Sequence, residues 1–371
     1  MSLIEHFATL EDPRIERKKL HSLVDMMVLS ICAITCGAEG WQDIADFGHE
    51  KLEWLRRFIP LKNGVPSHDC IAYVFARISP EDFRSCFMAW VESVREKTDG
   101  EVIAIDGKTS RGSKDLSQGK SPLHLVSAWA CANRLVLGQE ATAEKSNEIT
   151  AIPKLLELLD LKGCIITIDA MGCQTAIAKQ IVDQQGDYVL GLKDNQPLLH
   201  EAVDAYFSLA RRDHFKHIQH DYAEEIDKGH GRLETRRYWI CEDIRTLPHP
   251  ERWEGLRSIG MVERECISAG KSSLEQRYFI NSIPADAKLF AHAVRAHWGI
   301  ENRLHWRLDV VMREDDCRIR IGNAPAVFSM ARHLSLNLFE SVSAKLSLKQ
   351  KRFKAALNDD FREAVVFGPK F

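Results

Sequence analysis

The sequence lacks the features that mark disulfide-rich or membrane-spanning proteins. It contains ten cysteines, but no two of them form a CxxC pair or lie beside zinc-like partners. The longest apolar run, at residues 23–36, is shorter than the roughly 20 residues that cross a bilayer, and it contains Asp25. Acidic and basic residues precede that run, which is unlike a secretory signal. These absences favour a reducing cytoplasm, in which the cysteines are small buried hydrophobic residues.

Nucleotide-binding motifs are also incomplete. The GKT at 107–109 resembles the end of a phosphate-binding loop, but Val102 stands where the first glycine of that loop belongs. The GHG at 229–231 supplies two glycines of a dinucleotide fingerprint, but Glu234 stands in place of the third. Neither motif therefore predicts a nucleotide site.

The chain has no overall basic excess either. Its 50 basic and 53 acidic residues give a net charge of −3, whereas nucleic-acid-binding domains are usually basic. Local charge matters more for contact with a phosphate backbone. Lys351 and Arg352 belong to a basic run, 341–357, that contains no acid, and Lys108 and Arg111 form part of a second cluster. These four residues are candidate DNA contacts, although a solvated basic surface would give the same pattern.

Residues 1–98 are predicted to form an all-helical N-terminal domain. Apolar residues at helical spacing predict two helices before Pro60. Ser67 and Ser79 can cap two further helices, the second of which continues with a proline and two acids. The loop at 60–67 is longer than the usual helix-turn-helix connection, so the pattern permits DNA binding by this domain without showing it.

Residues 99–343 are predicted to form an α/β catalytic domain. The strand EVIAID at 101–106 is followed by a hairpin, a helix, the strand GCIITID, a helix, the strand DYVLGLK and a helix. The order β-β-β-α-β-α-β-α is that of the ribonuclease-H-like fold, which is built on a mixed sheet. In that fold the first and fourth strands lie side by side at the centre of the sheet.

The pattern changes between about residues 211 and 283. This stretch is rich in charge and histidine and contains several strand-like pieces, so it is predicted to be a β-rich insertion. Its Arg232 and Arg236 could contact backbone phosphates, although a solvated hairpin would look the same. Helical periodicity resumes at Asp286 and persists past Val310, a further helix is expected from about 324 to 342, and a basic tail, 344–371, follows.

An aspartate ends each of the two strands that are predicted to be central. Asp106 ends the first strand and Asp169 the fourth. A single aspartate at such a place is usually a cap or turn residue. Two of them on adjacent strands, joined by a third acid, are hard oxygen ligands that could hold a pair of divalent cations. Such a pair clamps the attacking and leaving oxygens of a phosphodiester, so the pattern predicts metal-dependent phosphoryl transfer.

Glu301 is the candidate third acid because it lies in the middle of a strongly helical segment downstream. Four other acids compete for this role: Asp309, Glu314, Asp315 and Asp316. Arg303 and Arg307 could instead engage Glu301 in a surface ion pair. His297 and His305 flank Glu301 by four residues on either side, but this spacing is not the HExxH of zinc enzymes.

Six motifs, in order, cover nearly the whole chain. They are VPSHDCIAYVF, AIDGKTSRGS, TIDAMGCQ, YVLGLKDNQ, GHGRLETR and HWGIENRLHWRLDVVMRED. On these motifs the chain resembles the DDE-type insertion-sequence transposases, specifically the H-repeat-associated (ISAs) group. The resemblance implies a ribonuclease-H-like catalytic core, a transposase-associated helical domain before it, and a β-rich insertion ahead of the last acid. It also implies the catalytic, metal-binding triad Asp106, Asp169 and Glu301, with Mg²⁺ as cofactor and Mn²⁺ as a substitute.

The same resemblance implies the partners and setting of the protein. The expected partner is double-stranded DNA, both the terminal inverted repeats of the element and the target. A homo-oligomer in a synaptic complex is expected by analogy, and no membrane is involved. The expected location is the bacterial cytoplasm, at the nucleoid when the protein is on DNA. The chemistry needs no covalent enzyme intermediate.

One part of the family pattern is missing. Many related transposases carry Tyr, Arg and Lys at −7, −4 and +7 from the glutamate, and the residues here are Val294, His297 and Leu308. Arg295 or Arg303 could contact phosphate in their place. Two alternatives stay open: a ribonuclease-H-like nuclease or resolvase without strand transfer, and a decayed DNA-binding protein.

Overall fold

The computed structural model describes residues 2–115, 119, 121–142, 148–229, 231–268 and 270–368. The chain divides into two compact units. The first unit comprises residues 1–96, 107–147 and 301–371, and the second unit comprises residues 97–106 and 148–300. The two units interleave along the sequence, and the division into domains at 98 and 343 stays a prediction. In the described part of the chain, no single helix is long and apolar enough to cross a membrane, and one sharply bent helix pair meets that test only jointly.

The N-terminal part of the first unit is helical, as predicted. Its helices are α1 (Leu3–Phe7), α2 (Leu23–Cys36), α3 (Trp41–Glu50), α4 (Leu52–Leu55), α5 (His68–Phe75) and α6 (Pro80–Val94). Ser67 and Ser79 accept hydrogen bonds from the backbone N–H groups of Cys70 and Asp82, so both predicted caps are confirmed. The predicted second helix is in two pieces, α3 and α4, which meet at Lys51.

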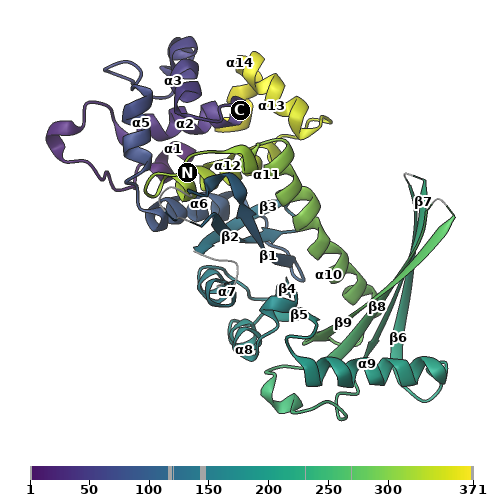
Figure 1. Ribbon diagram of the computed structural model, residues 1–371. Coiled ribbons are helices and arrows are strands. Elements are labelled where there is room, and N and C mark those ends of the chain that lie inside the picture. The colour runs from purple at the N-terminus through teal and green to yellow at the C-terminus, as the bar shows by residue number, and fades with distance from the viewer. Residues whose placement is uncertain are drawn as a thin grey trace. The chain divides into compact units, whose positions relative to one another are not determined.

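Helix α12 (Ala324–Glu340) is the central helix of the first unit (Figure 1). It is buried along most of its length and packs against α2 and β3 (Leu135–Thr142), which forms an antiparallel hairpin with β2 (Leu123–Ala130). The side chain of Asn337 joins helix to strand, because it donates to the carbonyl of Val136 and accepts from its N–H, each at 2.9 Å. The predicted basic tail instead folds into α13 (Leu348–Leu357) and α14 (Asp359–Phe367). Its last three residues lie outside the described chain.

Parallel strands form the centre of the second unit. β1 (Val102–Ser110) begins there and continues into the first unit, and β4 (Ile165–Ile168) and β5 (Asp187–Leu192) follow it in parallel register. The helices between and after them are α7 (Glu148–Glu157), α8 (Thr175–Asp183) and α9 (Pro197–Arg212). The strand order of the sheet is β3-β2-β1-β4-β5-β9-β8-β7-β6. Its first five strands have the ribonuclease-H-like order, so the predicted α/β fold class is confirmed.

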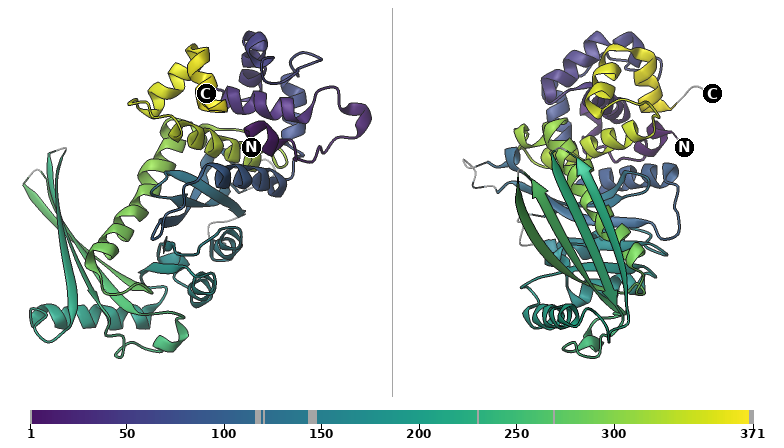
Figure 2. Two further views of the ribbon diagram at one scale, coloured as in Figure 1. Left: turned by 180° about the vertical axis from the view of Figure 1, so that it is seen from behind. Right: turned by 90° about the vertical axis from the view of Figure 1, so that its right-hand side faces the viewer.

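The β-rich insertion extends this sheet. Its strands are β6 (His220–Gly229), β7 (Arg232–Cys241), β8 (Ser258–Ser268) and β9 (Lys271–Asn281). They are antiparallel and form one long curved ribbon (Figures 1 and 2). The last strand, β9, returns beside β5, where Val189 pairs with Asn281. The insertion is therefore continuous with the catalytic sheet of the second unit, which the sequence pattern did not indicate.

A single helical segment follows the insertion. Helix α10 (Ala287–Ile300) packs on β4, β5, β6 and β7 of the second unit. The chain then forms a π-helical turn, Glu301–His305, and continues as α11 (Trp306–Val310) in the first unit. The predicted helix from 286 past 310 is confirmed. Its π turn could not be predicted, because apolar spacing does not distinguish one irregular turn from regular helix.

Candidate active site

Asp106 and Asp169 lie at matching positions on two neighbouring strands. The parallel register of β1 and β4 pairs Ile105 with Ile168, and each aspartate is the next residue in the chain. Adjacent strands lie about 4.8 Å apart, so the register brings the two carboxyl-bearing residues side by side. Both residues are half-buried. β4 ends at Ile168, one residue earlier than predicted, and β1 runs four residues past Asp106, to Ser110.

The carboxylate of Asp169 is oriented by its own backbone turn. It accepts a hydrogen bond from the N–H of Met171 at 3.0 Å and so caps the short 3₁₀ helix Ala170–Gly172. Gly191 on β5 packs directly against this turn. A β-carbon at position 191 would lie 3.2 Å from the backbone nitrogen of Ala170 and 3.5 Å from the carbonyl carbon of Asp169. Sequence reasoning missed Gly191, although a glycine inside a buried strand is a signal of close backbone approach.

His297 joins α10 to the strand that carries Asp169. Its Nδ1 lies 3.0 Å from the hydroxyl of Thr167, which shares a face of β4 with Asp169 because side chains alternate along a strand. Burial lowers the pKa of His297 to about 4, despite the opposing charge of Asp169, so the imidazole is neutral at pH 7. The resemblance described from the motifs implies an arginine at position 297. Here the residue packs inside the second unit.

Glu301 begins the π-helical turn that follows α10, and its side chain is exposed. Single π-helical turns inside α-helices are frequent at functional sites. Glu301 belongs to the first unit, whereas the two aspartates belong to the second. Within the described ranges, no three His, Cys, Asp or Glu side chains are gathered into a metal-binding cluster. The adjacent aspartates nevertheless fit a hard divalent cation, because carboxylate oxygens are the ligands that Mg²⁺ prefers.

Three of the four acids that compete with Glu301 surround Lys108 in the first unit. The Lys108 ammonium lies 2.7 Å from Asp309, 3.0 Å from Glu314 and 3.5 Å from Asp315. Glu314 is fully buried, and burial alone would raise its pKa. The charge of Lys108 outweighs that effect, with help from His333, Arg332 and Ser329, and lowers the pKa to about 2. The fourth competitor, Asp316, pairs with Arg313.

Three of the predicted DNA contacts have partners inside the protein. Lys108 is only 9% exposed. Lys351 donates to two backbone carbonyls at the end of α12, each at 2.8 Å. Arg352 donates to the carbonyls of Val311 and Ile34, at 2.5 and 3.3 Å. These contacts hold the charged groups of the three side chains inside the protein, so the geometry does not support the DNA contacts that were expected of them.

The other predicted DNA contacts differ in exposure. The side chain of Arg111 is 82% exposed, that of Arg232 is 52% exposed, and Arg303 is also exposed. Arg295 is 37% exposed and lies between Glu225 and Asp227. Arg236 is 6% exposed and pairs with Asp227 and Glu234. Arg111, Arg232 and Arg303 are therefore the most accessible of the set.

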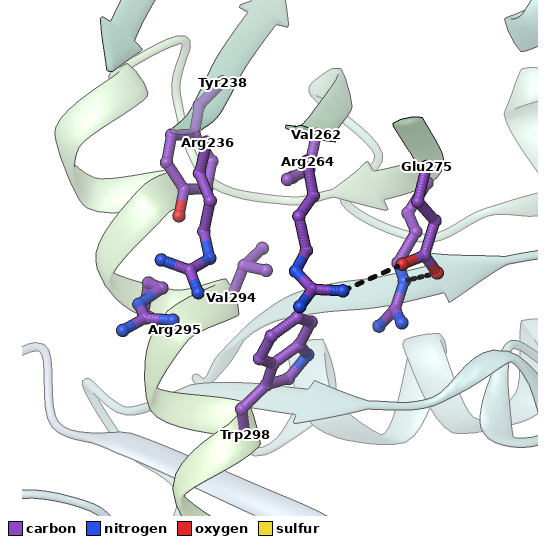
Figure 3. Close-up of a pocket in the computed structure, with 9 residues that line it drawn as sticks. Arg236, Tyr238, Val262, Arg264, Glu275, Val294, Arg295 and Trp298 are labelled. Atoms are coloured by element: carbon purple, nitrogen blue, oxygen red, sulfur yellow. Dashed lines mark hydrogen bonds and ion pairs between the residues drawn. The ribbon is translucent and has the colours of Figure 1, made fainter. Parts of the chain in front are cut away.

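Trp298 forms the floor of a small arginine-rich pocket in the second unit (Figure 3). Its ring lies 5.8 Å from the guanidinium of Arg236, 5.9 Å from that of Arg264 and 5.0 Å from that of Arg277. The cavity volume is about 10 Å³, which is room for about one water molecule. Carboxylates pair with these arginines: Asp227, Glu234 and Glu275. The pocket therefore ties α10 to the ribbon and has no room for a large ligand.

Comparisons with known proteins assign the family. The model of the transposase DDE domain family matches residues 97–338, and the DDE_Tnp_1-associated family matches residues 4–91. The "H repeat-associated putative transposase YhhI" of Escherichia coli (strain K12) is 43% identical over 99% of this chain and 98% of its own length. The "Putative transposase YncI" of Escherichia coli O157:H7 is 44% identical over 98% of this chain and 94% of its own length.

A solved structure, a piggyBac transposase synaptic complex with hairpin DNA, aligns with 99% of this chain and 72% of its own length. Its identity of 11% and TM-score of 0.42 are too low to decide anything further. The family match covers the strands that carry Asp106 and Asp169 and the helical segment that carries Glu301. On the family match and the two full-length relatives, the chain belongs to the DDE transposases of the H-repeat-associated group.

Proposed function

We propose that this protein is a DNA transposase that cleaves strands at the ends of its element and joins them to target DNA. The observation that carries the proposal is the register of β1 and β4, which sets Asp106 beside Asp169 at the centre of a ribonuclease-H-like sheet. Membership of the transposase family supports the DNA substrate. Glu301, at the π-helical turn, is proposed to complete the triad.

The three carboxylates would hold Mg²⁺, or Mn²⁺ in its place, which when bound lowers the pKa of water and neutralises charge on the phosphodiester. The protein's other residues orient the carboxylate ligands. The Met171 N–H holds one oxygen of Asp169, and neutral His297 leaves the negative charge beside it uncompensated. Water attacks the phosphorus at the element's end, which frees the 3′-hydroxyl of the element and leaves a 5′-phosphate on the flanking strand. The freed 3′-hydroxyl then attacks a target phosphodiester, and the target strand's own 3′ oxygen leaves as a hydroxyl. No protein nucleophile takes part.

The proposed partners are the element's terminal repeats and the target, bound by an oligomer of this chain on DNA. Arg111, Arg232 and Arg303 are exposed, and we propose that they contact backbone phosphates. The work would take place at the bacterial nucleoid. Arg236 and Arg295 line the closed pocket and could reach DNA only if their ion pairs opened.

The test is strand cleavage of DNA that carries the repeats flanking the gene. Asp106→Asn, Asp169→Asn and Glu301→Gln preserve side-chain size and remove charge, so each should abolish Mg²⁺-dependent cleavage while DNA binding persists. Cleavage by Asp106→Asn protein would overturn the site assignment. Supplying pre-cut ends separates the chemistries: joined products support transposition, whereas cleavage without joining supports a nuclease or resolvase. A wild-type protein that binds the repeats but neither cuts nor joins them would support a decayed transposase.

A further inference from the structure

Lys108 is a buried cation two residues after Asp106, and the triad does not use it. Its side chain is 9% exposed and points into a group of acids that follow Glu301 in the sequence. Asp309 comes from α11, and Glu314 and Asp315 come from the 3₁₀ turn Glu314–Asp316. All four residues belong to the first unit. One lysine therefore joins the second half of β1 to the segment that continues the Glu301 turn.

We call Lys108 with Asp309, Glu314 and Asp315 the Lys108 junction. Two of its acids have further partners in the first unit. Glu314 is completely buried, and its second oxygen accepts a hydrogen bond from the hydroxyl of Ser329 on α12, at 2.7 Å. Asp315 accepts from the backbone N–H of Arg111 at 3.1 Å. Glu314 and Asp315 are thus each held by Lys108 on one side and by α12 or the chain after β1 on the other.

The backbones on the two sides of the junction are also in contact. Gly112 packs so closely against the turn that a β-carbon there would overlap the carbonyl oxygens of Asp315 and Cys317. The guanidinium of Arg320 donates to the carbonyl of Gly112 at 3.3 Å. Because backbone cannot move aside as a side chain can, this contact limits how far the turn can shift from the end of β1.

We propose that Lys108 is a positioning residue for the transposase reaction, which holds α11 and hence the Glu301 turn in register with the end of β1. The inference rests on the proposed function, because it assigns Lys108 a role in the geometry of the same triad. The ammonium acts through Asp309 and Glu314 and touches no DNA. Loss of the ammonium leaves three acids around a site without its cation, so α11 separates from β1.

The first measurement needs neither DNA nor metal. Hydrogen exchange of the full-length protein is followed in peptides that cover residues 301–316, for wild type, Lys108→Met and Arg84→Met. Arg84→Met is the matched control, because it breaks a half-buried ion pair with Glu140 in the same unit, away from Asp309. We expect faster exchange in 301–316 for Lys108→Met alone. Equal exchange in the two variants would overturn the proposal.

The second measurement separates positioning from stability. Single-turnover cleavage is measured below the unfolding transition as a function of Mg²⁺ concentration. Lys108→Met should lower the rate by about 10- to 100-fold, the usual loss when a group that orients metal ligands is removed, and should raise the half-saturating Mg²⁺ concentration. Arg84→Met should change neither. If the Lys108→Met protein is less stable but cleaves with the wild-type rate and Mg²⁺ dependence, then Lys108 has only a structural role.

A charge-matched variant guards against failure to fold. Lys108→Met combined with Asp309→Asn and Glu314→Gln removes the ammonium together with the charges of the two acids nearest to it, and Asp315 keeps its contacts with Arg111. This variant should regain stability without regaining the rate. Restored cleavage in this variant would refute positioning by Lys108. If the wild-type protein itself does not cleave, the proposed function is wrong. The exchange measurement would still show whether Lys108 holds residues 301–316 in place.

Discussion

Strand β1 contributes to two groups of acids, because Asp106 belongs to one group and Lys108 is surrounded by the other. Asp106 and Asp169 are half-buried at neighbouring strand positions of the second unit. Asp309, Glu314 and Asp315 surround the ammonium of Lys108 in the first unit. Both groups consist of carboxylate side chains. Burial with a protein cation makes one group a structural junction, whereas half-burial at paired positions of parallel strands makes the other a candidate for divalent cations.

Replacing a carboxylate by the corresponding amide should abolish cleavage but spare stability in the first group, and should lower stability but spare cleavage in the second. Asp169→Asn keeps an acceptor for the Met171 N–H, so its unfolding free energy should stay within about 1 kcal/mol of wild type while cleavage is lost. Glu314→Gln should cost roughly 3 kcal/mol of unfolding free energy, because it breaks a buried ion pair, and should retain measurable cleavage. Urea unfolding and a cleavage assay check both. If Asp169→Asn lost stability and retained cleavage, Asp169 would be a structural residue and its assignment to the metal site would be wrong.

The pH dependence of stability should show the same difference. The pKa of Glu314 is about 2 in the folded protein, against an ordinary value of 4.5. Its contribution is therefore complete above pH 4.5 and is lost as the pH falls towards 2, which amounts to about 3 kcal/mol. Unfolding free energies of wild type and Glu314→Gln should converge over this range. The pKa values of His297 and His333 are lowered to about 4, so these two residues reduce stability at higher pH, as the pH falls from 6.5 to 4. Curves that stay parallel between pH 4.5 and 2 would contradict the assignment.

A backbone change should disturb the Asp106–Asp169 pair without altering any charge. Gly191→Ala places a β-carbon against the Asp169 turn, so we expect cleavage to fall by about 10- to 100-fold, as when a metal ligand loses its support. Gly229→Ala is the control, because nothing lies within 4 Å of a β-carbon at that strand position. Single-turnover cleavage at saturating Mg²⁺ compares the two. Equal rates would show that the Asp169 turn tolerates displacement.

The smallest effect is expected at the exposed arginines, and it distinguishes them from Lys108. Arg111→Ala and Arg303→Ala should each weaken DNA binding and lower the slope of log affinity against log salt by about 1, because one phosphate contact is lost. Lys108→Met should leave that slope unchanged, since its ammonium faces acids. Binding titrations at several salt concentrations measure the slope. If Lys108→Met changed the slope as much as Arg111→Ala does, Lys108 would be a DNA contact.

Local patterns predicted most of the elements and the two aspartates. Ser67 and Ser79 cap the helices that their sequence context predicted, because a cap needs only a few consecutive residues. Asp106 and Asp169 were found because strand order implies which strand ends are neighbours. The π turn at Glu301 and the return of β9 beside β5 were not predicted, since one irregular turn and one strand pairing leave little trace in apolar periodicity.

Basic residues were the least predictable part of the site. Lys108, Lys351 and Arg352 stand in basic stretches that look exposed, yet Lys108 and Arg352 bond to groups far away in the sequence and Lys351 bonds to carbonyls at and just beyond the end of α12. The order of most strands and helices and the family follow from the sequence, and the set of acids that shares a cation stays a prediction from it. The tertiary structure alone decided which charges face solvent and which face one another, because the free energy of a charge depends on its burial and on partners that only folding brings near.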